Sequence, residues 1–151
     1  VVLGTGDGEY EAFFRQLENE RHDRVRSFIQ YDRALSKKIY AAADLFLMPS
    51  RSEPCGLSQM IACRYGTVPV VRETGGLYDS IHPYYEDDRG MHGNGFTFDN
   101  YAASELEERV NAALSLHERR DSFAALRRRS MQSDFSWDAS AGKYMALYRQ
   151  M

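Results

Sequence analysis

The sequence contains no apolar run approaching the roughly 20 residues that an α-helix needs to cross a membrane, so no membrane span is predicted. Cysteine is scarce as well. Cys55 and Cys63 are the only two, too few for a disulfide scaffold, and their thiols are expected to be reduced in a cytoplasmic protein. The four histidines are scattered, with no partner at metal-ligand spacing, so no metal site is predicted.

An excess of positive charge is also missing. The chain carries 19 basic and 22 acidic side chains, for a formal net charge of -3. This balance gives no general attraction to nucleic acid, so a phosphate ligand would need a local site rather than a basic surface. At 151 residues and 43% hydrophobic composition, the chain suits a single globular domain.

Strand and helix patterns alternate along the chain, which predicts an α/β fold with a parallel sheet and helices on both faces. The run 44–49 is continuously apolar, as expected for a strand buried on both faces, while 83–95 reads as a polar, glycine-rich excursion. Ser104 and Ser136 are predicted to start helices, and Trp137, Tyr144 and Leu147 have helical spacing that favours packing over binding. The predicted strands are 1–3, 24–29, 44–49, 68–71 and 95–98, and the predicted helices begin near 9, 34, 57, 103, 118 and 136.

Three loops follow predicted strands, where open α/β sheets bind ligands. The loop at 4–8 lacks the third glycine of a dinucleotide-binding fingerprint, which leaves a simple tight turn as the favoured interpretation. The loops at 50–58 and 74–77 carry more information, because each joins a buried strand to a helix through glycine.

The 50–58 loop places a carboxylate at the start of a helix. Because a helix beginning near Leu57 leaves the backbone N–H groups of Gly56, Leu57 and Ser58 without intrahelical partners, its N-terminus favours an anion or sugar oxygens. Glu53 precedes Pro54, which biases it toward an extended conformation that would direct the carboxylate into a cleft. The alternative is an ordinary solvated loop carboxylate, and the pattern alone leaves both open.

Five segments together resemble bacterial glycogen synthase and plant starch synthase: LGTGD, YAAADLFLMPSRSEPCGLSQM, RYGTVPVVRETGGLYDS, GNGFTF and DFSWDASAGKYMALYR. The similarity runs from Val1 to Arg149. It implies a retaining glucosyltransferase of the glycosyltransferase-B fold, which moves glucose from ADP-glucose to the non-reducing end of an α-1,4-glucan without a metal or other cofactor. The chain resembles the C-terminal, nucleotide-sugar half of that fold, lacking its first strand and helix, with 133–151 as a crossover helix.

The resemblance assigns roles position by position. Glu53 matches the glutamate that contacts the donor glucose and supports the developing oxocarbenium charge, and Tyr31 matches an aromatic residue beside the adenine, although an ordinary loop tyrosine is the reading from sequence alone. Ser50, at the start of the loop, is a further candidate for substrate binding. Cys55, Gly56 and Leu57 match the loop segment whose amides hold sugar hydroxyls, and Ser58 matches the hydroxyl residue near the distal phosphate. The second glycine loop facing the cleft is matched by Thr74, Gly75 and Gly76.

Two departures accompany the resemblance. Neighbouring transferase families carry a second glutamate eight residues after the first, where this chain has Ile61, as glycogen synthases generally do. The arginine and lysine that clamp the donor phosphates lie upstream of position 1 in the family, and the α-1,4-glucan is bound through an N-terminal domain. Arg51 and Arg72 are candidate substitutes for the clamp, with a structural role or pairing to Glu53 or Glu73 as the alternative.

The expected function is therefore that of the donor domain of a glycogen or starch synthase, and the isolated chain is expected to be inactive. Two alternatives stay open: a retaining transferase domain that uses a UDP-sugar, and a non-catalytic nucleotide- or glucan-binding module.

Overall fold

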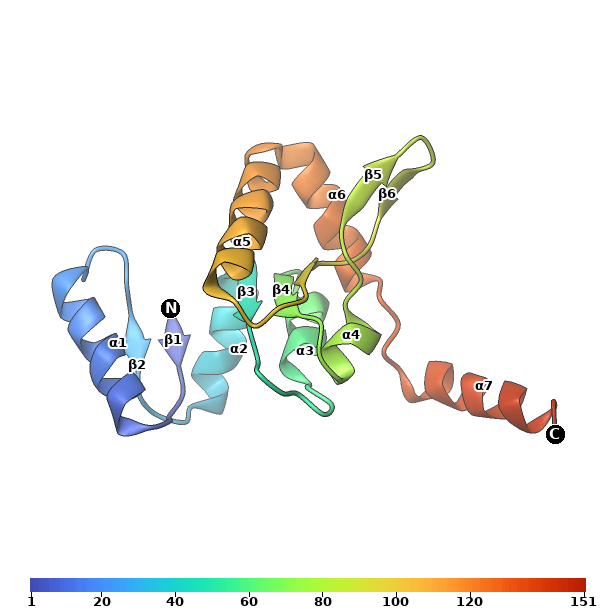
Figure 1. Cartoon of the computed structure of the whole chain (residues 1–151), viewed down its shortest axis with the longest axis horizontal. Coiled ribbons are helices and arrows are strands. Elements are labelled where there is room, and N and C mark those ends of the chain that lie inside the picture. The colour runs from blue at the N-terminus through green and yellow to red at the C-terminus, as the bar shows by residue number, and fades with distance from the viewer. The chain divides into compact units, whose positions relative to one another are not determined.

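A computed structural model describes all 151 residues (Figure 1), which divide into two compact units, Val1–Ala42 and Ala43–Met151. Each unit is described by itself. No helix in either unit combines the length and apolar character needed to span a membrane. Parallel strands joined through helices confirm the predicted α/β class.

The first unit is a small β-α-β-α arrangement with two parallel strands. Its elements are β1 (Val2–Leu3), α1 (Gly8–Glu20), β2 (Ser27–Phe28) and α2 (Arg33–Ala42). Val2 pairs with Ser27, and Leu3 with Phe28. The strand predicted at 24–29 is shorter than expected, because the N–H groups of Arg24 and Val25 both donate to the Arg21 carbonyl in a turn.

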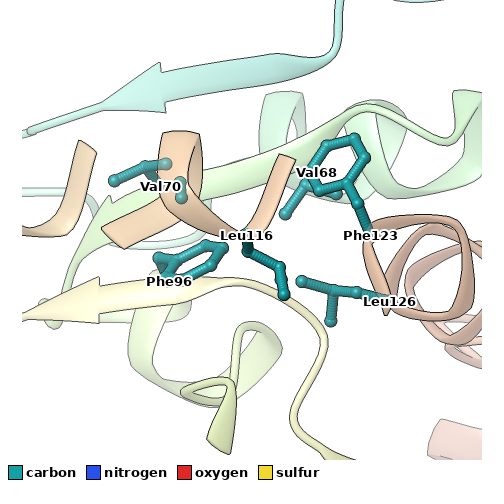
Figure 2. Close-up of a cluster of buried hydrophobic side chains, with 7 residues drawn as sticks. Val68, Val70, Phe96, Leu116, Phe123 and Leu126 are labelled. Atoms are coloured by element: carbon teal, nitrogen blue, oxygen red, sulfur yellow. The ribbon is translucent and has the colours of Figure 1, made fainter. Parts of the chain in front are cut away.

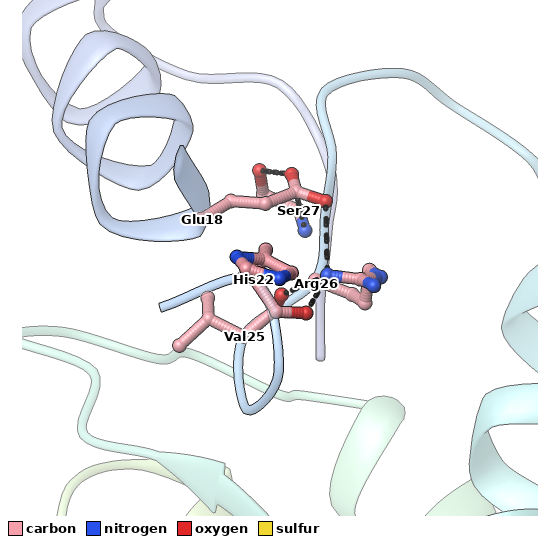
Figure 3. A network of polar contacts seen from close by, with 5 residues as sticks. All are labelled: Glu18, His22, Val25, Arg26 and Ser27. Atoms are coloured by element: carbon pink, nitrogen blue, oxygen red, sulfur yellow. Dashed lines mark hydrogen bonds and ion pairs between the residues drawn. The ribbon is translucent and has the colours of Figure 1, made fainter. Parts of the chain in front are cut away.

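A polar network joins α1 to β2 in this unit (Figure 3). The Glu18 carboxylate accepts hydrogen bonds from the Ser27 hydroxyl, at 2.6 Å, and from its backbone N–H, at 3.1 Å. Arg26 lies 3.8 Å from the same carboxylate and also donates to the carbonyls of His22 and Val25. The hydrogen bonds from Ser27 hold the pKa of Glu18 below its usual value.

The second unit is built on three parallel strands in the order β3-β4-β7. Leu45 pairs with Val68 at one end of the ladder, and Arg72 pairs with Phe98 at the other. The strands of this unit are β3 (Leu45–Met48), β4 (Val68–Arg72), β5 (Tyr85–Asp87), β6 (Gly90–His92) and β7 (Phe96–Phe98). Its helices are α3 (Ser58–Tyr65), α4 (Gly76–Ser80), α5 (Ala103–Glu118), α6 (Arg120–Met131) and α7 (Trp137–Tyr148).

The central strand β4 separates two apolar clusters. Val68 and Val70 contribute to the larger cluster (Figure 2), whose other buried members are Phe96, Ala113, Leu116, Phe123 and Leu126. Val71 contributes to the smaller one, with Cys63, Leu77 and Ile81. Because side chains alternate along a strand, Val70 and Val71 point to opposite faces, and β4 is buried on both. The buried strand gives the loop at its carboxyl end a fixed starting point.

One strand prediction was wrong. β3 is not buried on both faces: Leu47 is 48% exposed, because β3 lies at the edge of the three-stranded sheet. The 83–95 excursion contains an unpredicted antiparallel hairpin of β5 and β6, in which the rings of Tyr85 and His92 stack with centroids 4.4 Å apart. His92 also lies 2.9 Å from the Asp87 carboxylate, and this contact lowers the pKa of Asp87.

The helix-start predictions had mixed outcomes. Ser136 is confirmed as an N-cap, because its hydroxyl accepts a hydrogen bond from the Ala139 N–H at 3.2 Å. Ser104 does not cap α5, which begins at Ala103 after Ala102. Instead, the Glu105 carboxylate accepts from the N–H groups preceding the helix.

The packing favoured for the C-terminal helix is not made within this chain. No residue of α7 is buried, and Trp137 is 90% exposed, Tyr144 64% and Leu147 55%. Helical spacing therefore marks an apolar face here without showing what covers it.

Truncating the larger cluster tests where the stability of the second unit resides. Leu126→Ala removes a fully buried side chain and is expected to lower the free energy of unfolding by about 2–5 kcal/mol. Leu114→Ala, at a position 48% exposed on α5, is the matched control and is expected to cost less than about 1 kcal/mol. Urea denaturation of the chain measures both values. Equal losses in the two variants would contradict this placement of the core.

Candidate functional site

The two loops predicted from the sequence lie at the carboxyl ends of strands in the three-stranded sheet. The 49–57 segment joins β3 to α3, and the 73–75 segment joins β4 to α4. β3 and β4 are parallel neighbours, with Met48 opposite Val71, so the segments that follow them start side by side at the carboxyl ends of the two strands. Open α/β sheets bind ligands at the carboxyl ends of their strands.

The two loops touch through their backbones. The Gly76 N–H donates to the Glu53 carbonyl at 3.0 Å. A Cβ on Gly75 would lie 2.1 Å from that same oxygen, and a Cβ on Gly76 would lie 1.9 Å from the Cys55 carbonyl oxygen. Gly75 also has φ +49°, a conformation that favours glycine. Only glycine at both positions permits this approach.

Arg72 holds the beginning of the Glu53 loop. Its Nη1 donates to the carbonyl of Arg51 at 2.9 Å and to that of Ser50 at 3.4 Å, while its Nε donates to the Asp99 carbonyl at 2.9 Å. The structural role considered for Arg72 is therefore confirmed. It pairs with neither Glu53 nor Glu73; the Glu73 carboxylate accepts instead from the Thr97 hydroxyl at 2.6 Å.

The N-terminus of α3 is left open. Leu57 occupies the N-cap position, and no side chain caps the helix there. The backbone N–H groups of Gly56, Leu57 and Ser58 donate no hydrogen bond within the chain. Unsatisfied amides and the helix dipole together favour an anion or an array of hydroxyl oxygens at this place.

The Glu53 side chain lies against Gly56, and its carboxylate has no partner within the chain. The residue is half-buried, and no hydrogen bond or ion pair of the chain engages its side chain. Its Cγ is 3.0 Å from the point that a Cβ on Gly56 would occupy, and Gly56 has φ +65°. Cys55 and Leu57 are exposed on either side, with Leu57 63% exposed.

The remaining predicted residues fall in two places. Thr74 belongs to the second loop, where its carbonyl accepts from the Leu77 N–H at 3.1 Å. Tyr31 belongs to the first unit, where it precedes α2 and is 87% exposed. Its neighbour Asp32 accepts from the Leu35 N–H at 2.8 Å, so that local contact starts the helix. The adenine contact of Tyr31 stays a prediction.

Comparison with known proteins gives the family. The family model described as "Glycosyl transferases group 1" matches residues 1–129. The chain belongs to this glycosyltransferase family. Parallel α/β architecture within such a family confirms the predicted fold, a glycosyltransferase-B half.

Curated relatives of this glycosyltransferase chain include glycogen synthases from several bacteria. The chain is 48% identical over 148 residues to that of Bacillus licheniformis, covering 98% of the chain and 30% of the relative. It is 44% identical over 151 residues to that of Bacillus subtilis, covering 100% of the chain and 31% of the relative. The chain thus spans less than a third of the length of these relatives.

Solved structures give a similar picture. The catalytic domain of starch synthase IV from Arabidopsis thaliana, bound to ADP and acarbose, matches with a TM-score of 0.82 and 39% identity, covering 97% of this chain and 31% of that one. Sucrose-phosphate synthase from Thermosynechococcus elongatus matches with a TM-score of 0.65 and 26% identity, covering 98% of this chain and 37% of that one.

The site of this glycosyltransferase chain includes two polar residues that the sequence analysis missed. Gln59 on α3 and Ser80 on α4 are buried and hydrogen-bonded to each other. The sequence did contain a sign of this pair: Gln59 lies on the same helical face as the apolar residues Ala62 and Cys63. A polar side chain on a buried face needs a hydrogen-bond partner. No group of three or more His, Cys, Asp or Glu side chains is arranged to hold a metal ion.

Adding a methyl group to Gly76 tests the backbone contact between the loops. Gly76→Ala forces the Cys55 carbonyl to move and is expected to destabilise the chain by about 1–3 kcal/mol and to weaken nucleotide-sugar binding. Gly8→Ala is the matched control, because nothing lies within 4 Å of its added Cβ. Thermal unfolding reports the stability of both variants. A Gly76→Ala chain as stable as Gly8→Ala would show that the loops do not touch in this way.

Proposed function

We propose that this chain is the donor-binding part of a glycogen or starch synthase, which transfers glucose from ADP-glucose to the non-reducing end of an α-1,4-glucan with retention of configuration. The observation that carries the proposal is the unpartnered Glu53 side chain against Gly56, the residue that precedes the uncapped N-terminus of α3. The glycogen synthase relatives and the ADP-bound starch synthase match support the same assignment.

The chemistry follows from the two kinds of group in the loop. The amides of Gly56, Leu57 and Ser58 are donors, suited to sugar hydroxyls and to the phosphate nearer the glucose. The Glu53 carboxylate is an acceptor, suited to glucose hydroxyls and to the positive charge that develops on the sugar during transfer. A fixed carboxylate stabilises that charge without reorganising when it forms, which is the effective form of electrostatic catalysis.

Partners and location follow the same proposal. ADP-glucose or ADP is the ligand at the Glu53 loop, and the glucan is bound by the part of the enzyme that this chain does not include. The adenine contact of Tyr31 rests on the family resemblance alone. Free thiols at Cys55 and Cys63 accord with a cytoplasmic enzyme. The chain as a C-terminal nucleotide-sugar domain, with 133–151 as its crossover helix, is part of the proposal.

Calorimetry with ADP and UDP tests which nucleotide the protein prefers. The full-length protein that carries this chain is expected to bind ADP about tenfold more tightly than UDP, a difference of about 1.4 kcal/mol. Equal or tighter UDP binding would favour the UDP-sugar transferase. Binding of neither nucleotide would contradict the donor-domain proposal, and glucan binding alone would favour a non-catalytic module. The chain by itself is expected to transfer no glucose from ADP-glucose to glycogen, and measurable transfer would refute that expectation.

Neutralising Glu53 tests its role in transfer. In the full-length protein that carries this chain, Glu53→Gln is expected to lower the transfer rate about 100- to 1000-fold, because a carboxamide cannot stabilise the developing positive charge. ADP affinity is expected to change less than about threefold, since the carboxylate addresses the sugar. Glu107→Gln, an exposed glutamate on α5, is the control and should retain full activity. Initial rates with labelled ADP-glucose decide the matter, and an unimpaired Glu53→Gln enzyme would remove Glu53 from the mechanism.

A further inference from the structure

Gln59 is a fully buried glutamine in the first turn of α3, with a relative exposure of 0%. Its Nε2 donates to the Gly56 carbonyl at 2.9 Å and to the Ser80 hydroxyl at 3.0 Å. One amide nitrogen therefore reaches both the end of the Glu53 loop and the last residue of α4.

Ser80 extends this connection into the second loop. Its hydroxyl donates to the Gly76 carbonyl at 2.6 Å while it accepts from Gln59. The bonds run without a break from Gly56 through Gln59 and Ser80 to Gly76. Gly76 is also the residue whose N–H donates to the Glu53 carbonyl. The side-chain connection and the backbone bond thus link the same two loops at different depths.

The other half of the Gln59 amide makes no hydrogen bond. Its Oε1 is buried without a partner and lies 2.7 Å from the point that a Cβ on Gly56 would occupy. A methionine would fill a similar volume without burying an unpaired oxygen, so packing alone does not favour glutamine at this position. The donating nitrogen is the part of the side chain that explains its presence.

We propose that Gln59 is a positioning residue, which holds the Glu53 loop against the Gly75–Gly76 loop so that the carboxylate stays in place beside the α3 amides. The proposal rests on the function proposed above for Glu53. Gln59 is buried and acts through the loop backbone rather than by touching the donor. Its loss is therefore expected to affect the placement of the sugar more than the binding of the nucleotide.

Amide hydrogen exchange by NMR tests the connection without any ligand. In Gln59→Met, the Gly76 amide is expected to exchange at least tenfold faster, because its bond to the Glu53 carbonyl opens more often. The Val68 amide, bonded to the Asp44 carbonyl in the core, should keep its wild-type rate. Ser130→Ala is the matched control, since Ser130 is equally buried but lies on α6, where its hydroxyl meets the Cys63 thiol rather than either loop. Unchanged Gly76 exchange, or equal acceleration at Gly76 and Val68, would overturn the proposal.

A double-mutant cycle and a binding comparison complete the test. Ser80→Ala should accelerate Gly76 exchange as Gln59→Met does. The double variant should exchange little faster than either single variant, because both substitutions remove the same Gln59–Ser80 hydrogen bond. Fully additive effects on the exchange rate would count against the connection. In the full-length protein that carries this chain, ADP-glucose affinity should fall at least tenfold in Gln59→Met, with ADP affinity within threefold of wild type. Parallel losses for both ligands would overturn a positioning role. If the full-length wild-type protein binds no ADP-glucose, the proposed function fails, and Gly76 exchange alone still decides whether Gln59 holds the loops together.

Discussion

The carbonyl oxygens of Glu53 and Cys55 occupy the space where side chains at positions 75 and 76 would begin. This contact between two backbones fixes the geometry of the candidate site, because it determines where the Glu53 loop stops relative to the start of α4. Backbone contacts of this kind leave little freedom for adjustment, since neither partner has a flexible side chain that can rotate away. The candidate carboxylate is thus carried on a rigid support although it lies in a loop.

The support is continuous with the core of the second unit. β4 is packed on both faces, and Arg72 at its end donates to the carbonyls at the beginning of the Glu53 loop. Gln59 and Ser80 hold the far end of the same loop. The loop is therefore fixed at both ends by groups on neighbouring elements, and the unpaired donors and acceptor of the site lie on the segment between them. Such an arrangement provides preorganised charge for a ligand that carries both hydroxyls and phosphates.

Local signals predicted much of this from the sequence. Glycine and proline in the 50–58 segment marked where β3 ends and where α3 begins with unpaired amides. At its other end, α3 stops at Gly66, which has the left-handed conformation common at helix C-termini. Non-local facts were out of reach. The exposure of Leu47 depends on β3 lying at an edge, the hairpin at 85–92 depends on a cross-strand pair, and the role of Gln59 depends on Ser80, 21 residues away. The apolar face of α7 showed a similar limit, because spacing reveals a face but not its partner.

The bonds at the beginning of the Glu53 loop use the carbonyls of Ser50 and Arg51, while the side chains of Arg51 and Ser52 are exposed and make no hydrogen bond. Substitutions of the side chains at positions 51 and 52 should therefore leave the backbone of the loop in place. These two positions are natural attachment points for an environment-sensitive fluorophore, introduced through an engineered thiol after Cys55 is replaced. A label there would sit within a few residues of Glu53 and leave the supporting bonds untouched.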